Sequence, residues 1–277
     1  MAVRSAGTAG GCRDRGWSSR RSNLALARAS EHGIAAVAIR ESHHIACLAA
    51  YLLRATEQGF VLMVASSDAN SASVAPFGGT RAVFTPDPLA IGFPTAGDPV
   101  LVDISASITT NGMSARLHKA GQRFAHRWLL DAKGAPTEDP AVLFAEPPGT
   151  ILPLGGLEAG HKGYGLALLV EALTGGLAGF GRADPKQGWG ATVFVQAFDP
   201  DAFGGRDAFV RQAEFIAGQC RDNPPRPGVD AVRVPGERAV ALRREQLASG
   251  VQLHESIMPA LQPRAQNLAV SLPAAIG

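Results

Sequence analysis

A pair of adjacent histidines is the first feature of the sequence that could do chemistry. Ser42, His43 and His44 follow a short apolar run and precede a stretch with apolar residues at helical spacing. A histidine between the carboxyl end of a strand and the start of a helix lies where the crevices of α/β proteins open. Because imidazole exchanges protons near neutral pH, His44 is a candidate for proton transfer. The plainer alternative is that one of the two histidines only caps the helix.

A second candidate segment starts at Asp103, which closes another apolar run and is followed by Ile104, Ser105 and, two residues later, Ser107. An aspartate and two hydroxyls at the end of a buried strand predict a loop that faces a ligand. An Asx or Ser turn that only reverses the chain explains the same residues equally well.

Two helix starts are candidate anion sites. Lys162 follows His161 in a glycine-flanked segment, where backbone N–H groups and the ammonium group would converge on an anion. A solvated lysine beside a turn is the alternative. Gly236, Glu237 and Arg238 begin another expected helix, and alone they indicate no more than a helix entry.

Several common chemistries lack their sequence signatures. No Gly-x-Gly-x-x-Gly follows the first expected strand, so a Rossmann domain is not predicted. The P-loop pattern, the His-Glu-x-x-His zinc motif and the Gly-x-Ser-x-Gly nucleophile elbow are missing too. Cys12, Cys47 and Cys220 form no Cys-x-x-Cys pair, which predicts no disulfide framework and a reducing, cytoplasmic setting. His44 and Cys47 lie three apart without further ligands, so we expect packing there and no metal site.

The segments that position these residues alternate between strand and helix. Residues 34–39 and 60–65 are expected buried strands, and 45–58 is the helix between them. A strand–helix–strand unit predicts an α/β protein. Further strands are expected at 89–93, 100–104, 128–130 and 192–198, and helices up to Gly33 and at 162–177, 203–220 and 238–250.

Composition bounds the class of protein. Of the 277 residues, 46% are hydrophobic, which predicts a folded core rather than disorder. The formal net charge of +2 is too small for the concentrated basic face that nucleic acid needs. No apolar run reaches the length of about 18 residues that a membrane span requires.

Residues 1–21 differ in composition from the rest of the chain. They are rich in Gly, Ser and Arg, show no periodicity and contain no apolar region of a secretory signal. We expect this segment to be disordered or non-native, and order to begin near Ser22. Residues 22–277 are then expected to form one compact domain.

In their order along the chain, these segments resemble a known family. The malate/L-lactate dehydrogenase-like family of NAD(P)-dependent oxidoreductases shows Asn-Ser-x-His-(Phe/Tyr)-Gly, Pro-x-Gly-Gly, Gly-Thr-Asn-Pro, Asp-Met-Ala-Thr-Ser, Gly-x-Pro-Thr-x-Asp-Pro, Lys-Gly-x-Gly-Leu and Pro-Gly-Glu in this order. The corresponding segments here are Ser42–Ala46, Pro76–Gly79, Phe84–Pro88, Asp103–Ser107, Gly134–Pro140, Lys162–Leu166 and Pro235–Glu237. The resemblance runs from about Asn23 to the C-terminus.

The resemblance implies an α/β fold that is not the Rossmann fold, with a mixed central sheet flanked by helices, and a homodimer with sites between subunits. The implied reaction moves a hydride between NAD or NADP and C2 of a small 2-hydroxy or 2-oxo acid. His44 would exchange the proton, Asp103 would orient or stabilise a charged imidazole, and Ser42 would bond to His44. The residues that match the family's cofactor positions are Asp103, Ile104, Ser105, His161, Lys162, Gly236, Glu237 and Arg238.

Departures from the family pattern keep two alternatives open. His43 beside His44, with Ala46 in place of the family's glycine, looks more like the branch that reduces the cyclic imino acids Δ1-piperideine-2-carboxylate and Δ1-pyrroline-2-carboxylate. Family members also begin with a helical region that carries Ser-His-Gly-x-x-Arg, and this motif does not occur in the chain. The second alternative is therefore a catalytically impaired remnant that binds the cofactor but lacks the arginine for the substrate carboxylate. Arg40 and Arg116 are the candidates to replace that arginine.

Overall fold

A computed structural model describes residues 14–184 and 190–274 of the chain. The described residues divide into two compact units, one that ends at Pro235 and one that begins at Gly236. All the named strands belong to the first unit, and the second holds the helices α6 (Glu237–Ser249) and α7 (Ile257–Asn267). In the described ranges, no helix combines the length and the apolar character needed to cross a membrane.

A five-stranded sheet in the order β1-β8-β2-β3-β4 is the centre of the first unit. Its strands are β1 (Ile34–Ser42), β2 (Val61–Asp68), β3 (Pro88–Phe93), β4 (Val100–Ser105) and β8 (Ala191–Phe198). Every pair of neighbours in it is antiparallel. The prediction of an α/β fold without a Rossmann sheet is confirmed, but the expectation of a mixed sheet is wrong. β1 and β2 do run in the same direction, yet β8 lies between them and pairs with both.

Two of the three inner strands, β8 and β2, are apolar almost without interruption. In β8, the run from Ala191 to Val195 is buried, and in β2 Val61, Leu62, Val64 and Ala65 are buried. Strands covered on both faces read as continuous apolar runs instead of alternating ones. These runs make both strands recognisable from the sequence, but they do not show that β2 and β8 pair with each other.

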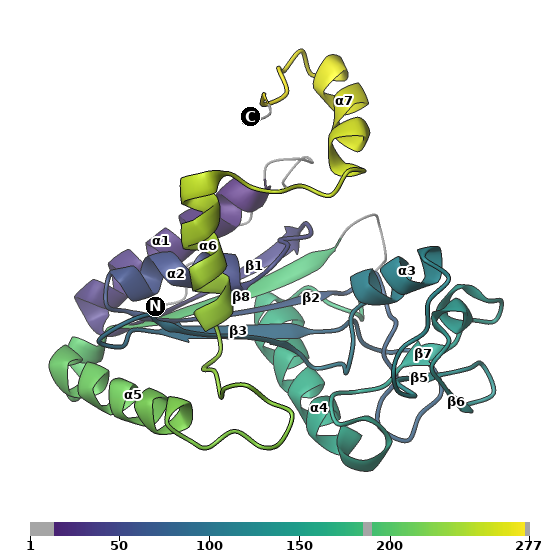
Figure 1. The fold of residues 1–277 in the computed structure, drawn as a ribbon, viewed down its shortest axis with the longest axis horizontal. Helices are drawn as coiled ribbons and strands as arrows, with labels where there is room; N and C mark the ends of the chain where they lie inside the picture. The colour runs from purple at the N-terminus through teal and green to yellow at the C-terminus, as the bar shows by residue number, and fades with distance from the viewer. Residues whose placement is uncertain (1–13, 185–189, 275–277) are drawn as a thin grey trace. The chain divides into compact units, whose positions relative to one another are not determined.

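Helices cover both faces of the sheet (Figure 1). On one face lie α1 (Asp14–His32) and α2 (Ala49–Glu57), and on the other lies α4 (Gly156–Glu171), which continues into a π-helical turn at Ala172–Gly176. α5 (Arg206–Arg221) packs against β3 and β4, where the rings of Phe93 and Phe209 meet edge to face.

The start of α1 corrects the expectation for the N-terminal segment. The helix begins at Asp14, so residues 14–21 are helical, although we expected disorder up to residue 21. Residues 1–13 lie outside the described range. The end of the helix is as predicted: Gly33 has a φ of 81°, and its N–H bonds to the carbonyl of Ala29 at 2.6 Å.

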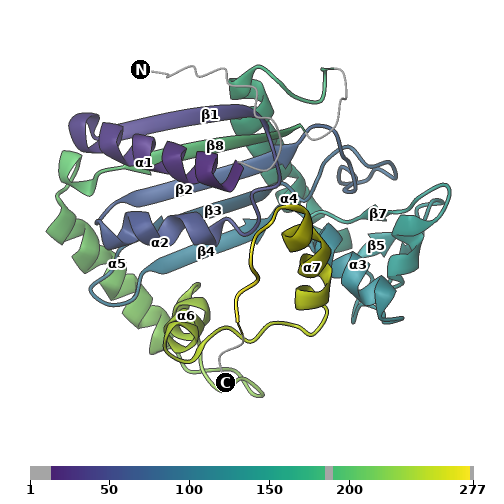
Figure 2. The ribbon, with the colours of Figure 1, turned by 90° about the horizontal axis from the view of Figure 1, so that it is seen from above.

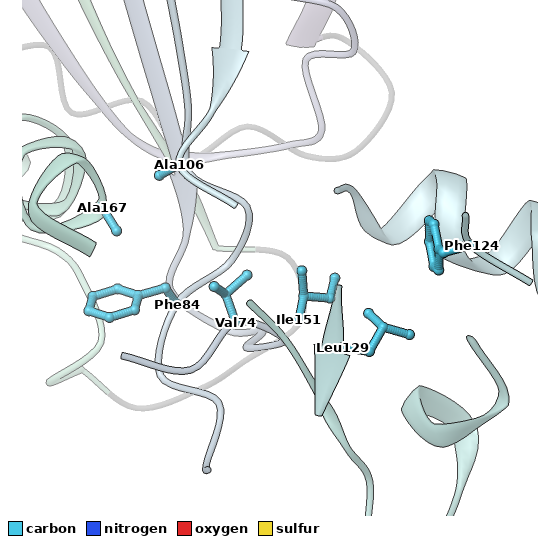
Figure 3. Close-up of a cluster of buried hydrophobic side chains, with 7 residues drawn as sticks. All are labelled: Val74, Phe84, Ala106, Phe124, Leu129, Ile151 and Ala167. Atoms are coloured by element: carbon cyan, nitrogen blue, oxygen red, sulfur yellow. The ribbon is translucent and has the colours of Figure 1, made fainter. Parts of the chain in front are cut away.

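A small three-stranded sheet lies beyond the ends of the long strands, together with helix α3 (Asn111–Lys119) (Figure 2). Its strands are β5 (Leu129–Leu130), β6 (Pro136–Thr137) and β7 (Thr150–Ile151), and a short 3₁₀ helix spans Pro140–Phe144. One cluster of buried side chains joins this region to the end of β4 and to α4 (Figure 3). The cluster consists of Val74, Phe84, Ala106, Phe124, Leu129, Ile151 and Ala167. The small sheet is therefore anchored to the central sheet through apolar packing.

Candidate functional site

One edge of the central sheet brings together the ends of strands that are distant in sequence. Ala191, at the start of β8, lies opposite both Ser42 and Asp68, and Pro88 lies opposite Ser105. A cavity of about 620 Å³ opens at this edge. It is lined by residues 44–48, 66–68, 71, 85, 86, 88, 103–105, 110–112 and 191. The carboxyl ends of three strands thus supply most of its wall.

His44 lines the cavity from the connection between β1 and α2. His43 is not part of the lining, and its Nδ1 accepts a hydrogen bond from the backbone N–H of His44 at 2.9 Å. Of the two histidines, His44 is therefore the one that lines the cavity. Ser42 is buried at the end of β1 and does not reach the cavity wall. Its proposed bond to His44 stays a prediction.

The loop that carries His44 contains a strained residue. Ala46 has a φ of 62°, a left-handed conformation that is costly for any residue with a Cβ atom. It stands where the related family has glycine, which adopts this conformation freely. The turn delays the start of the next helix, so α2 begins at Ala49 and not at Ile45 as expected.

Asp103 fastens this loop to the end of β4. Its Oδ2 atom accepts a hydrogen bond from the backbone N–H of Ala49 at 2.8 Å and another from the Cys47 thiol at 3.3 Å. The carboxylate therefore caps α2, whose own N-cap residue, Leu48, makes no side-chain bond. Burial, followed by the hydrogen bond and the negative charge of Asp103, raises the pKa of the Cys47 thiol. The thiol stays protonated, as its role of donor requires.

The two residues that follow Asp103 also line the cavity. Ile104 is 41% exposed and offers an apolar surface there, and the Ser105 hydroxyl donates to the carbonyl of Ser107 at 2.9 Å. The segment therefore lines the cavity and is held by a bond within itself, and its role toward a ligand stays a prediction.

A helix N-terminus that the sequence did not reveal also reaches the cavity. Thr110 caps α3, because its hydroxyl accepts from the backbone N–H of Met113 at 3.1 Å. Asn111 and Gly112 form the first turn and line the cavity. The amide groups of a first turn and the positive end of the helix dipole favour an anion at this position. The available signal was a threonine before Asn-Gly, which also fits a simple turn.

Hydroxyl groups and a buried ion cluster form another side of the cavity. Ser67 and Thr85 line it, and each bonds to a carboxylate behind the wall. The Ser67 hydroxyl donates to Oε1 of Glu171 at 2.7 Å, and the Thr85 hydroxyl donates to Oδ1 of Asp87. Arg182 donates to Glu171 through Nε at 2.8 Å and lies 3.9 Å from Asp87.

Asp87 is the unusual member of this cluster. Its side chain is completely buried, and its backbone has a φ of 44°. Burial is the largest cause that raises the pKa of Asp87 to about 7, and the negative charge of Glu171 is the second. No local pattern shows that Glu171 and Arg182 come to meet Asp87.

The structure does not bring His161 and Lys162 to the cavity wall. His161 and Lys162 are exposed on α4, where the His161 ring contacts the ring of Phe77 at 5.8 Å between centroids. The expectation that Lys162 begins the helix is wrong, since α4 starts at Gly156. Gly155 and Gly156 both have positive φ and turn the chain before that point.

Gly236, Glu237 and Arg238 begin α6, in the second compact unit. The sequence predicted a helix entry there, and the structure confirms it. A role of these residues toward a cofactor stays a prediction.

Comparison with known proteins tests the resemblance noted in the sequence. The profile of the malate/L-lactate dehydrogenase family matches residues 18–262. The L-lactate dehydrogenase of Cupriavidus necator is 34% identical over 91% of this chain and 72% of its own length. The (2R)-3-sulfolactate dehydrogenase (NADP(+)) of Chromohalobacter salexigens is 35% identical over 86% of this chain and 69% of its own length.

A solved structure agrees with this assignment. The crystal structure of Δ1-piperideine-2-carboxylate reductase from Pseudomonas syringae superposes with a TM-score of 0.74 and 28% identity, covering 89% of this chain and 72% of that chain. The family match begins inside the segment that we expected to be unrelated, which agrees with the early start of α1. This chain belongs to the malate/L-lactate dehydrogenase family.

Proposed function

We propose that the chain is a nicotinamide-dependent oxidoreductase that moves a hydride between NAD or NADP and C2 of a small 2-hydroxy or 2-oxo acid. One observation carries this proposal. A histidine suited to proton transfer, His44, and a helix N-terminus suited to an anion, that of α3, open into the same cavity. The family membership and the dehydrogenase names of the two relatives support it.

The donors around the cavity fit a nicotinamide dinucleotide. The first turn of α3 offers backbone N–H groups to a diphosphate, and the hydroxyls of Ser66 and Ser71 offer partners to ribose or carboxamide groups. Ile104 presents an apolar surface suited to the face of a ring. When bound, the nicotinamide supplies or accepts the hydride.

The chain's own residues supply the proton and the geometry. We propose that His44 exchanges a proton with the oxygen on C2 as the hydride moves. Asp103 acts on the loop of His44, because it holds both Cys47 and Ala49. Its bonds to α2 make Asp103 a positioning residue. We further propose that it can contact the charged imidazole of His44 directly.

The substrate carboxylate needs a cation, and neither candidate arginine lines the cavity. Arg40 pairs with Glu41 at 3.7 Å, and Arg116 contacts the sulfur of Met113 at 3.1 Å. We propose that the protein acts as a homodimer, in which a partner subunit can add to the site. Exposed apolar side chains on α4 support an interface there, namely Leu157, Leu168 and Leu169. Light scattering that shows an active monomer would contradict this.

We propose a reducing compartment such as the cytoplasm for this protein. Cys47 and Cys220 are both free and exposed, which supports that setting.

Reduction of a cyclic imino acid is the second candidate reaction. The doubled histidine and Ala46 favour it, together with the likeness to Δ1-piperideine-2-carboxylate reductase. Protonation of an imine nitrogen places the same demand on His44 as protonation of a carbonyl oxygen. The two reactions differ in substrate and not in the apparatus that the cavity provides.

A substrate panel tests these proposals. Oxidation of NADH and of NADPH would be followed with pyruvate, oxaloacetate and Δ1-piperideine-2-carboxylate, and cofactor binding would be measured separately by fluorescence titration. Turnover of about 10 s⁻¹ or more with an oxo acid supports the dehydrogenase, and a preference for the imine supports the second candidate. Tight cofactor binding with almost no turnover indicates the cofactor-binding remnant. Absence of both binding and turnover contradicts all three.

A further inference from the structure

The buried cluster behind the cavity wall has an unbalanced set of charges. It contains two carboxylates, Asp87 and Glu171, and one guanidinium, that of Arg182. Asp87 has no exposed surface, and its Oδ2 atom has no hydrogen-bond partner among the described residues. An uncompensated negative charge in such surroundings is costly, so the cluster is most stable when one carboxyl carries a proton.

The contacts show which carboxyl takes that proton. Glu171 contacts Arg182 twice, through Nε at 2.8 Å and Nη2 at 2.7 Å, and accepts a bond from the Ser67 hydroxyl at 2.7 Å, and these contacts stabilise its charged form. Asp87 lies 3.9 Å from the same guanidinium and accepts a bond from the Thr85 hydroxyl. The pKa of Asp87, raised to about 7 by burial and by Glu171, agrees with this division.

The cluster is in direct contact with the cavity lining. Ser67 and Thr85 are at once part of the wall and hydrogen-bond donors to Glu171 and Asp87. One hydroxyl therefore separates each carboxyl from whatever occupies the cavity. When Asp87 loses its proton, a full negative charge appears behind the wall, in a medium that screens it poorly.

We propose that an anionic ligand in this cavity binds together with a proton, which is taken up by Asp87. The inference rests on the proposed function in one respect, since the ligands of that function, a dinucleotide diphosphate and an oxo acid, are anions. Linkage makes the effect reciprocal: the ligand favours the protonated cluster, and the protonated cluster favours the ligand. Asp87 is then a positioning residue that sets affinity without touching the reacting atoms.

Other ionisable groups near the cavity must be separated from this effect. Glu171 and Arg182 face Asp87 within the cluster, whereas His44, Asp68 and Asp103 face the cavity itself. Imidazole groups in general exchange protons near neutral pH, and His44 lines the cavity, so pH dependence of binding alone does not identify the group. The substitution Asp87→Asn does, because it keeps the shape of the side chain and removes its titration.

Calorimetry measures the proton directly. Binding of NADH and, separately, of oxalate would be titrated in buffers with different ionisation enthalpies between pH 6 and 8. For the wild type we expect net proton uptake near pH 7.5 and a Kd that rises up to roughly tenfold from pH 6 to 8. For Asp87→Asn we expect both the proton uptake and the rise in Kd to be smaller than in the wild type, because the share of Asp87 is lost. Asp207→Asn, the same change on an exposed residue of α5, serves as the matched control and should behave as the wild type.

A second variant tests the cluster independently of Asp87. Glu171→Gln removes the neighbouring negative charge that helps to raise the pKa of Asp87, so the uptake should move to lower pH. Thermal unfolding of the ligand-free variants between pH 6 and 8 reports the same proton without any ligand. A change of melting temperature with pH that is present in the wild type and absent in Asp87→Asn shows that Asp87 titrates in this range.

The outcomes distinguish this inference from the proposed function. Coupled binding of oxalate without any binding of NADH supports the inference and contradicts the cofactor assignment. Equal proton uptake in the wild type and in Asp87→Asn overturns the inference while NADH binding stands. If neither probe binds at any pH, both fail.

Discussion

The two sides of the cavity handle charge in opposite ways. On the histidine side, residues 44–48 and 103–105, the ionisable groups are exposed and can meet a ligand directly. On the acid side, made of Ser67, Thr85, Asp87, Glu171 and Arg182, the charged side chains are buried or partly buried and reach the cavity through hydroxyl groups. Groups that exchange protons with a substrate must touch it, whereas groups that set the local field work best where water does not screen them. The residues that can exchange a proton with a substrate are therefore separate from those that set the electrostatic potential of the cavity.

The largest expected effect belongs to the histidine side. His44→Gln should lower kcat/KM by roughly 10²–10⁴, because general acid–base catalysis contributes that much. Cofactor affinity should change little. His126→Gln, an exposed histidine near the small sheet, is the matched control and should leave the rate unchanged. Equal rates for both variants would show that the proton comes from another group.

Titration of the acid side should instead change the free energy of unfolding. Because the pKa of Asp87 is raised from 3.8 to about 7 on folding, the folded state binds the proton more tightly than the unfolded state. The contribution of this proton to the free energy of unfolding is complete below pH 3.8 and is lost as the pH rises to about 7. The wild type should thus lose roughly 2–4 kcal/mol relative to Asp87→Asn across this window. Chemical unfolding at several pH values measures the difference, and parallel curves for the two proteins would contradict the account.

A smaller effect is expected where the histidine side is fastened to α2. Asp103→Ala removes the cap of Ala49 and should cost about 0.5–2 kcal/mol of stability. It should also lower the pKa of the Cys47 thiol, since the bond and charge that raise it are gone. The rate of alkylation of Cys47 against pH measures this, and Cys220 on α5 is an internal control in the same molecule. An unchanged profile for Cys47 would show that burial alone sets its pKa.

The smallest effect concerns the strained residue in the histidine loop. Ala46→Gly should stabilise the protein by up to about 1 kcal/mol, because glycine adopts the left-handed conformation without strain. The opposite sign is expected for Ala50→Gly, which places glycine inside α2 and should cost about 0.5–1 kcal/mol. Thermal unfolding of the two variants compares the same chemical change in two backbone conformations.

How well the sequence predicted these regions depended on the range of the interactions. The strands at 34–39, 60–65 and 192–198 were recognisable because runs of apolar residues carry a local signal. The start of α2 was placed wrongly because its cap comes from Asp103, 54 positions away.

The acid side was missed altogether, because a buried ion cluster assembled from a turn, a helix end and a loop has no spacing rule. The resemblance to the family identified the histidine segment through its motif. It gave no indication of Asp87, which stands in one of the segments where the chain departs from the family pattern.

The position of β8 has a consequence for how the chain reaches its native state. Residues 191–198 fill the place between β1 and β2, and the pair Val61–Phe198 spans most of the first unit. Until that late segment emerges from the ribosome, both earlier strands present unpaired edges rich in valine and alanine. Contacts of such long range slow folding, since loop-closure entropy is lost before they form. The nascent chain therefore passes through an interval in which its future core is open to aggregation, and faster closure of the sheet should raise the yield of folded protein.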